Sequence, residues 1–169
     1  MRVVVHDATV LIDLIEIDLL GPWFRLGFKA VTTTLVWREV NRKGQKGKLR
    51  RFADTGYLRV ESVNADTLTE VVGLHMELSC SISLEDASVL HLAAASEGVL
   101  LTSDSVLRRC ASEKGVEVHG ILWVFDTLVS RGKLNPLVAA ERLEALTARG
   151  ISWLPKVECT QRIKKWRRA

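Results

Sequence analysis

The sequence predicts a single α/β domain in which a parallel β-sheet of about five strands lies between helices in a three-layer arrangement. Three observations predict this class. Short runs rich in β-branched and aliphatic residues alternate with helical stretches of about 10–15 residues. The chain has 169 residues, the length of one domain. Its apolar fraction of 47% and charged fraction of 26% are typical of a globular protein and argue against disorder.

The expected strands are short runs separated by helices. Arg2–His6 and Val99–Ser103 are strongly apolar, so we expect both to be buried strands. Ala30–Thr34 and Leu58–Val63 are further candidates, and Val116–His119 predicts an edge strand. In a parallel sheet of this kind, ligands bind beyond the carboxyl ends of the strands, near the point where the strand order reverses.

Helical periodicity and capping residues predict the segments between the strands. Gly21–Pro22 is expected to end the first helix. The second helix begins near Leu35–Val40 and is expected to run into a basic loop that contains Gly44 and Gly47. The remaining expected helices cover residues 64–79, 83–97, 104 onward, 121–130 and 135–150.

The basic residues are concentrated in two segments. Of the 24 Lys and Arg residues, six lie within residues 42–51 and six follow Pro155, which leaves an acidic body. This distribution has two interpretations: solvated charge runs, or basic segments that hold a polyanion while the acidic body holds a cation. The bases of the first segment are Arg42, Lys43, Lys46, Lys48, Arg50 and Arg51.

We expect three parts along the chain: a core over residues 1–134, a C-terminal helix and docking segment over residues 135–154, and a basic tail over residues 155–169. Trp166 in this tail has two interpretations, since it could stack on a nucleobase or anchor the tail. Neither interpretation is favoured by the residues alone.

The cysteines and the hydropathy indicate the compartment. Cys80, Cys110 and Cys159 are widely spaced and odd in number, which favours reduced thiols and a cytoplasmic protein. Acidic residues interrupt the apolar N-terminal segment, so we do not expect a signal peptide. No uncharged apolar run approaches the ~18 residues of a membrane span, so no membrane partner is expected.

Acidic residues lie where the predicted sheet would place a ligand. Asp7 directly follows the first strand, and Asp104 directly follows the strand at Val99–Ser103. Asp86 lies in the first turn of a later helix, and Glu39 lies one turn into the second helix. Because the carboxyl ends of parallel strands share one edge, we expect these carboxylates to converge on one cleft.

Each of these acids also has a purely structural interpretation, because Asp is a good helix N-cap and Ser83-x-x-Asp86 fits a capping box. Carboxylates gathered in one cleft repel each other, however, unless a cation lies among them. Oxygen ligands without a Cys or His cluster suit Mg²⁺ or Mn²⁺. We therefore expect a Mg²⁺ or Mn²⁺ site.

The acidic residues lie in four segments: VVVHDATVLIDL near the start, VWREV on the second helix, SLEDASVLHLAAA in the middle, and LLTSDSVLRR after a buried strand. In this order and spacing, the chain resembles the PIN-domain family over about residues 1–130, in particular toxins of the VapC type from toxin–antitoxin pairs. The resemblance implies a five-stranded parallel sheet between helices. It also implies metal-dependent endonucleolytic cleavage of RNA, which leaves 5′-phosphate and 3′-hydroxyl ends.

The resemblance carries over to single residues. The predicted catalytic and metal-binding residues are Asp7, Glu39, Asp86 and Asp104. Glu85 leaves the third acid ambiguous, while Thr9 and Ser103 are expected to orient carboxylates or water. The bases of residues 42–51 are expected to contact RNA phosphates. An antitoxin protein and a homodimer, with a seam over residues 64–97, are the other expected partners.

Two other function classes stay open at this point. A PIN-like domain without catalysis would be an RNA- or protein-binding module. A phosphatase acting on small phosphoesters is the third hypothesis, although Thr9 stands where the Asp-x-Asp motif of haloacid dehalogenases needs a second acid. Asp126 is a spare acid in an apolar helix, either a minor ligand or a helix or interface residue.

Overall fold

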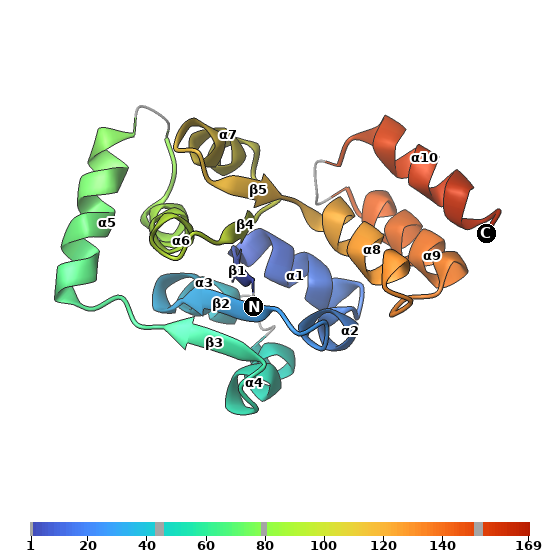
Figure 1. Ribbon diagram of the computed structural model, residues 1–169, viewed down its shortest axis with the longest axis horizontal. Helices are drawn as coiled ribbons and strands as arrows, with labels where there is room; N and C mark the ends of the chain where they lie inside the picture. The colour runs from blue at the N-terminus through green and yellow to red at the C-terminus, as the bar shows by residue number, and fades with distance from the viewer. Residues whose placement is uncertain (1, 43–45, 79–80, 151–153) are drawn as a thin grey trace.

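The computed structural model describes residues 2–42, 46–78, 81–150 and 154–169, apart from the side chains of residues 41, 42 and 46 (Figure 1). Its strands are β1 (Val3–His6), β2 (Lys29–Thr33), β3 (Leu58–Glu61), β4 (Val99–Leu101) and β5 (Glu117–His119). Its helices are α1 (Ala8–Glu16), α2 (Leu20–Phe24), α3 (Thr34–Arg42), α4 (Lys46–Asp54), α5 (Ala65–Glu77), α6 (Leu84–Ala95), α7 (Ser105–Glu113), α8 (Ile121–Ser130), α9 (Pro136–Ala148) and α10 (Lys156–Trp166).

All five strands are parallel, and their order across the sheet is β3-β2-β1-β4-β5. The chain adds β2 and β3 on one side of β1, and then β4 and β5 on the other side. The strand order therefore reverses between β1 and β4, and β5 is an edge strand. Helices flank this sheet, with α5 at one end of the molecule and α8, α9 and α10 at the other (Figure 1). The predicted α/β class, with five parallel strands between helices, is confirmed.

The central strands are apolar on both faces. Val4 and Val5 of β1 and Leu100 and Leu101 of β4 have no exposed surface, as expected where helices cover both faces of a parallel sheet. Helix α6 packs across β1, β2 and β4. Since α6 ends shortly before β4 begins, its N-terminus points toward the carboxyl edge of these strands.

Two helices lie where the sequence predicted a helix stop and a loop. Gly21 and Pro22 belong to α2, so the predicted stop is wrong. Proline is tolerated in the first turn of a helix, where its missing N–H has no intrahelical partner to lose. Gly47, expected in a basic loop, belongs to α4. Leu49 and Phe52 lie three residues apart on one face of α4, and their burial explains why this segment is helical.

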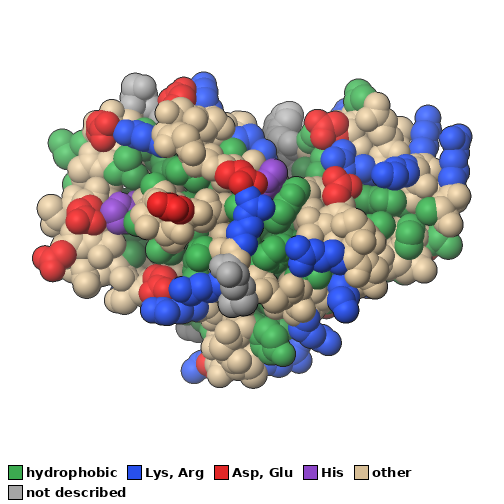
Figure 2. Space-filling model, in the orientation of Figure 1, with side chains coloured by type: hydrophobic (Ala, Val, Ile, Leu, Met, Phe, Trp, Pro, Cys, Tyr) green, Lys and Arg blue, Asp and Glu red, His purple; other side chains and the backbone are tan. Residues whose placement is uncertain are grey.

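Helix α4 carries the exposed bases of the first basic segment. It ends three residues before β3 begins, so its C-terminal end lies at the amino edge of the sheet, opposite to the edge where Asp7 and Asp104 follow their strands. Figure 2 shows Lys and Arg side chains at the lower rim of the molecule around α4 and at the upper right over α10. The described side chains are Lys48, Arg50 and Arg51, whereas those of Arg42, Lys43 and Lys46 lie outside the described residues.

The second basic segment, residues 155–169, contains the amphipathic helix α10. Cys159 and Trp166 are buried on its inner face, and α10 packs along α9. The Trp166 ring lies 5.8 Å from that of Phe125, measured between centroids. Trp166 is therefore an anchor of this helix. Within the predicted docking segment, residues 151–153 lie outside the described residues, and Leu154 packs against the core.

The cysteines depart in part from the sequence prediction. Cys110, buried in α7, is disulfide-bonded, so the expectation of reduced thiols is wrong for this residue. Cys159 is a free, buried thiol, and Cys80 lies outside the described residues. In the part of the chain that the structure describes, no helix combines the length and apolar character needed to cross a membrane.

Candidate active site

Asp7 is the first residue after β1, and only 1% of its surface is exposed. Its Oδ1 accepts the backbone N–H of Ala8 at 2.6 Å. Its Oδ2 accepts two hydroxyl groups, that of Thr9 at 2.7 Å and that of Thr102 at 2.8 Å. Because both oxygens have donors, this carboxylate is held firmly between the ends of β1 and β4.

The turn between β4 and α7 is fastened to α1. Thr9 Oγ1 accepts the backbone N–H of Ser103 at 3.0 Å, and Thr102 Oγ1 accepts that of Asp104 at 3.0 Å. Ser103 Oγ donates to Oδ2 of the buried Asp13 at 3.1 Å. These hydrogen bonds join the two chain segments on either side of the point where the strand order reverses.

Asp86 and Asp104 both cap helices. Asp86 Oδ2 accepts the N–H of Ser83 at 2.9 Å in the capping box of α6, and Asp104 Oδ1 accepts the N–H of Leu107 at 2.7 Å at the start of α7. The structural interpretation of these two acids is therefore correct. The backbone N–H groups bind one oxygen of each carboxylate, Oδ2 of Asp86 and Oδ1 of Asp104, and the Ser83 side chain also interacts with the Asp86 carboxylate. The backbone caps thus leave one oxygen of each carboxylate for another ligand.

The three aspartates influence one another through space. Burial raises the pKa of Asp7 from 3.8 to about 6, and the charge of Asp86 adds to this rise against the lowering effect of the Thr9 hydroxyl. Burial also raises the pKa of Asp86, and the charges of Asp104 and Glu85 add to it. Carboxylates from the starts of α1, α6 and α7 therefore share one electrostatic environment, which a cation would relieve.

The donor set suits a hard divalent cation in its chemistry, because it consists of carboxylate oxygens supported by hydroxyl groups. In the positions that the described side chains occupy, no group of three or more His, Cys, Asp or Glu residues is close enough to hold one ion. Repulsion between like charges keeps carboxylates apart. Closure around an ion would therefore require side-chain rotation, for which the oxygens of Asp86 and Asp104 outside the backbone caps are available.

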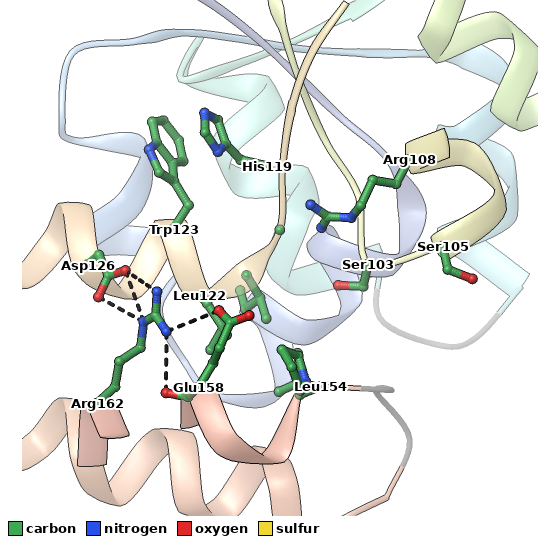
Figure 3. Close-up of a pocket in the computed structure, with 13 residues that line it drawn as sticks. Ser103, Ser105, Arg108, His119, Leu122, Trp123, Asp126, Leu154, Glu158 and Arg162 are labelled. Atoms are coloured by element: carbon green, nitrogen blue, oxygen red, sulfur yellow. Dashed lines mark hydrogen bonds and ion pairs between the residues drawn. The ribbon is translucent and has the colours of Figure 1, made fainter. Parts of the chain in front are cut away.

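The remaining predicted acids occupy different positions. Glu39 is half-buried on the second turn of α3, which packs against α1 and α6. Glu85 is half-buried next to Asp86, so the ambiguity between these two neighbours persists. Asp126 is engaged elsewhere, because its carboxylate forms a bidentate pair with Arg162 at 2.8–3.1 Å (Figure 3).

With this geometry established, comparisons with known proteins identify the family. A family model described as a PIN domain (DUF3368) matches residues 3–168. The chain belongs to the PIN-domain family. PIN domains are generally nucleases, so the fold is that of a nuclease-like hydrolase. The match includes α9 and α10, beyond the residues that carried the resemblance in the sequence.

Solved structures agree with this PIN fold, and 19 chains match. One is the crystal structure of PAE2754 from Pyrobaculum aerophilum, with a TM-score of 0.56 and 19% sequence identity, covering 77% of this chain and 96% of that chain. At this identity, the likeness concerns the fold alone. No curated protein matches the chain.

Two polar residues close to Asp7 in this PIN domain were not among the site residues predicted from the sequence. Thr102 forms hydrogen bonds with both Asp7 and the N–H of Asp104, whereas its neighbour Ser103, not Thr102, was predicted to orient the site. Asp13 is buried and accepts the Ser103 hydroxyl. A signal for Asp13 existed, since it lies four residues after Thr9 and so on the same face of α1. For Thr102, the signal was a hydroxyl residue at the carboxyl end of a buried strand.

His6 precedes Asp7 but points to the opposite side, as neighbours along a strand do. Trp23 Nε1 donates to His6 Nε2 at 2.8 Å, so His6 Nδ1 carries the proton and donates to the Val31 carbonyl at 3.2 Å. Burial lowers the pKa of His6 to about 4, which keeps the ring neutral. His6 is therefore a satisfied core residue.

Proposed function

We propose that this PIN domain is a metal-dependent endoribonuclease that uses Mg²⁺ or Mn²⁺. The observation that carries the proposal is the shared electrostatic environment of Asp7, Asp86 and Asp104, which come from three separate elements. Asp7 and Asp104 follow the two strands between which the strand order reverses, the usual ligand position in an open α/β sheet. Together with Glu39, these residues would hold the ion.

The chain's own groups position this site. The hydroxyls of Thr9 and Thr102 fix the Asp7 carboxylate, and the backbone N–H of Asp104 is tied to the Thr102 hydroxyl. A divalent ion held by these carboxylates would supply the activation of a water molecule and the neutralisation of negative charge on the phosphate. Donors that are already in place cost no reorganisation when the reaction occurs.

RNA as the substrate is supported by family membership and by the exposed bases. Lys48, Arg50 and Arg51 on α4 would attract RNA phosphates in a salt-dependent way and without base specificity. Their place near the amino edge of the sheet means that an RNA strand bound to both regions would have to pass around the domain. Close contacts with the strand near the cut bond must then come from other residues.

The cellular role follows as a further part of the proposal. We infer a toxin with an antitoxin partner, and a homodimer formed through α5 and α6. The exposed apolar side chains of Leu68, Val72 and Met76 along α5 support such a seam. A non-catalytic binding module is the competing hypothesis, and it predicts RNA binding without cleavage.

Cleavage assays on Asp7→Asn and Asp104→Asn test the proposal. Asn caps a helix about as well as Asp, so both variants should fold while losing at least about 100-fold in Mn²⁺-dependent cleavage of single-stranded RNA. Asp66→Asn is the matched control, because Asp66 is an exposed acid in the first turn of α5. Folded variants that cut RNA as well as the parent would overturn the proposed mechanism.

A further inference from the structure

A cavity of about 340 Å³ lies next to the proposed metal site, between α7, α8 and α10 (Figure 3). Its volume falls in the range of small-molecule sites. Ser103 lines it, so the turn between β4 and α7 separates the cavity from the carboxylates on the other side. The residues that matter for its chemistry are Ser103, Arg108, His119, Leu122, Trp123 and Leu154.

Arg108 brings a positive charge into this cavity. Its Nη2 donates to the Thr102 carbonyl at 3.0 Å, and no carboxylate among the described residues pairs with it. Arg162, in the same cavity, differs because Asp126 and Glu158 both bind its guanidinium. In Figure 3, Arg108 points toward Ser103 from one side, while the Asp126–Arg162 pair lies on the other side. Arg108 is therefore the cation with donors left for an anionic ligand.

Gly120 makes room for this guanidinium. A Cβ atom at Gly120 would lie 2.5 Å from Arg108 Nη2. The backbone there has φ of −118°, which any residue can adopt, so the glycine is needed for space and not for conformation. An alanine at this position would push the guanidinium away from the Thr102 carbonyl while leaving the charge on the protein.

The cavity has a polar part and an apolar part. The polar part consists of Arg108 and the Ser103 hydroxyl, which come from the first turn of α7 and the turn before it, near the carboxylates. The apolar part consists of the aliphatic side chains of Leu122 and Leu154 and of an aromatic pair, because the His119 ring stacks on that of Trp123 with centroids 4.6 Å apart. An anionic group joined to a flat, weakly polar ring matches this division, because guanidinium binds phosphate and aromatic side chains stack on bases.

We propose that this cavity binds one nucleotide of the RNA strand adjacent to the bond that is cut, with its phosphate on Arg108. The inference rests on the proposed function for the identity of the strand. It adds to that function one RNA-binding residue, Arg108, on the far side of the turn that carries Asp104. Arg108 then contacts a phosphate that does not react, so it contributes to affinity.

Binding of RNA without cleavage tests the inference. The probe is a fluorescein-labelled, single-stranded ten-nucleotide RNA, titrated by anisotropy in EDTA at several KCl concentrations. Arg108→Ala should weaken binding roughly tenfold and reduce the slope of log affinity against log salt by about 0.7, the share of one phosphate contact. Gly120→Ala, which keeps the charge and displaces the guanidinium, should weaken binding by a smaller factor. Arg109→Ala, on the exposed next residue of α7, is the matched control and should change affinity less than about twofold.

Equal affinity and equal salt slope for Arg108→Ala and Arg109→Ala would overturn the inference, as would a parent protein that does not bind the RNA. Should Arg108→Ala lose its fold, an unchanged affinity in Gly120→Ala overturns it instead. Parallel cleavage assays with Mn²⁺ separate this result from the proposed function. A parent that cuts RNA while the two arginine variants bind alike rejects only the nucleotide site. A parent that binds through Arg108 but never cuts rejects only catalysis.

Discussion

The two sides of the turn between β4 and α7 differ in charge. On one side, burial raises the pKa of Asp7 and of Asp86, and the charges of Asp86 and Asp104, respectively, add to these rises. On the other side, Arg108 has no carboxylate partner among the described residues. Thr102 links them, since its hydroxyl donates to Asp7 and its carbonyl accepts from Arg108. A single turn thus separates a region suited to cations from a region suited to anions.

Under the proposed function, this difference would allow a small domain to bind a polyanionic strand next to a cluster of acids. A carboxylate site alone repels RNA, and a basic site alone offers no ligands for a cation. Placing the two on opposite sides of one turn keeps the arginine from pairing with the carboxylates. An Arg–Asp pair across the turn would lower the pKa of the acid and remove both functions.

The largest expected effect is on the carboxylate side of the turn and concerns how the unfolding free energy depends on pH. The pKa of Asp7 is higher in the folded protein, about 6, than its ordinary 3.8, so this group stabilises the fold below pH 4 and that stability is lost as pH rises through 6. The parent should lose about 2 kcal/mol of unfolding free energy from this group between pH 4 and pH 7. Asp7→Asn should lack that loss.

Urea unfolding at pH 4, 5.5 and 7 measures this difference. The stability of Asp7→Asn relative to the parent should rise across the series, while Asp66→Asn should follow the parent. If the unfolding free energies of the parent and Asp7→Asn change with pH in parallel, ionisation of Asp7 does not destabilise the fold. That result would weaken the case for a cation at this position.

The next prediction concerns Thr102, which hydrogen-bonds to Asp7 on one side of the turn and to Arg108 on the other. Thr102→Val preserves side-chain shape but removes the donor to Asp7 and the acceptor of the Asp104 N–H. Loss of such a supporting bond should lower Mn²⁺-dependent cleavage by about 10–100-fold. Thr69→Val, whose hydroxyl bonds only its own helix backbone on α5, is the control. Cleavage by Thr102→Val at the parent rate would mean that the Asp7 carboxylate needs no such support.

The smallest effect concerns the arginine that is already paired. A double-mutant cycle with Asp126→Asn and Arg162→Leu should give a coupling energy of about 1 kcal/mol in urea unfolding, because the bidentate pair is only partly exposed. A coupling energy of zero would remove the distinction drawn between Arg162 and Arg108.

Much of the fold could be predicted from the sequence, because the signals are local. The strand at Val99–Ser103, the periodic helix over residues 64–79 and the capping box that starts at Ser83 depend on neighbouring residues only, and the structure places β4, α5 and the start of α6 there. Helices α2, α4 and α10 were missed. Each is short or rich in charge, and each is stabilised by a few buried side chains, such as Leu49 and Trp166, whose partners are distant in sequence.

Some features of the candidate site could likewise be predicted from local sequence, whereas others depend on contacts between distant segments. Asp7 and Asp104 could be placed at one edge because each follows a strand. The bonds from Thr102 to Asp7 and from Ser103 to Asp13 depend on how β4 lies beside β1, which no local pattern specifies. Arg108 could not be found at all, since its significance depends on the space left by Gly120 in the next strand connection.

Calorimetric titration of the purified protein with Mn²⁺ at pH 7.5 tests the central claim most directly. The account predicts saturable binding in the parent, a loss of at least about tenfold in affinity for Asp7→Asn and Asp86→Asn, and parental affinity for Asp66→Asn. No saturable binding in the parent, or equal affinity in Asp7→Asn, would contradict a metal site at this edge of the sheet.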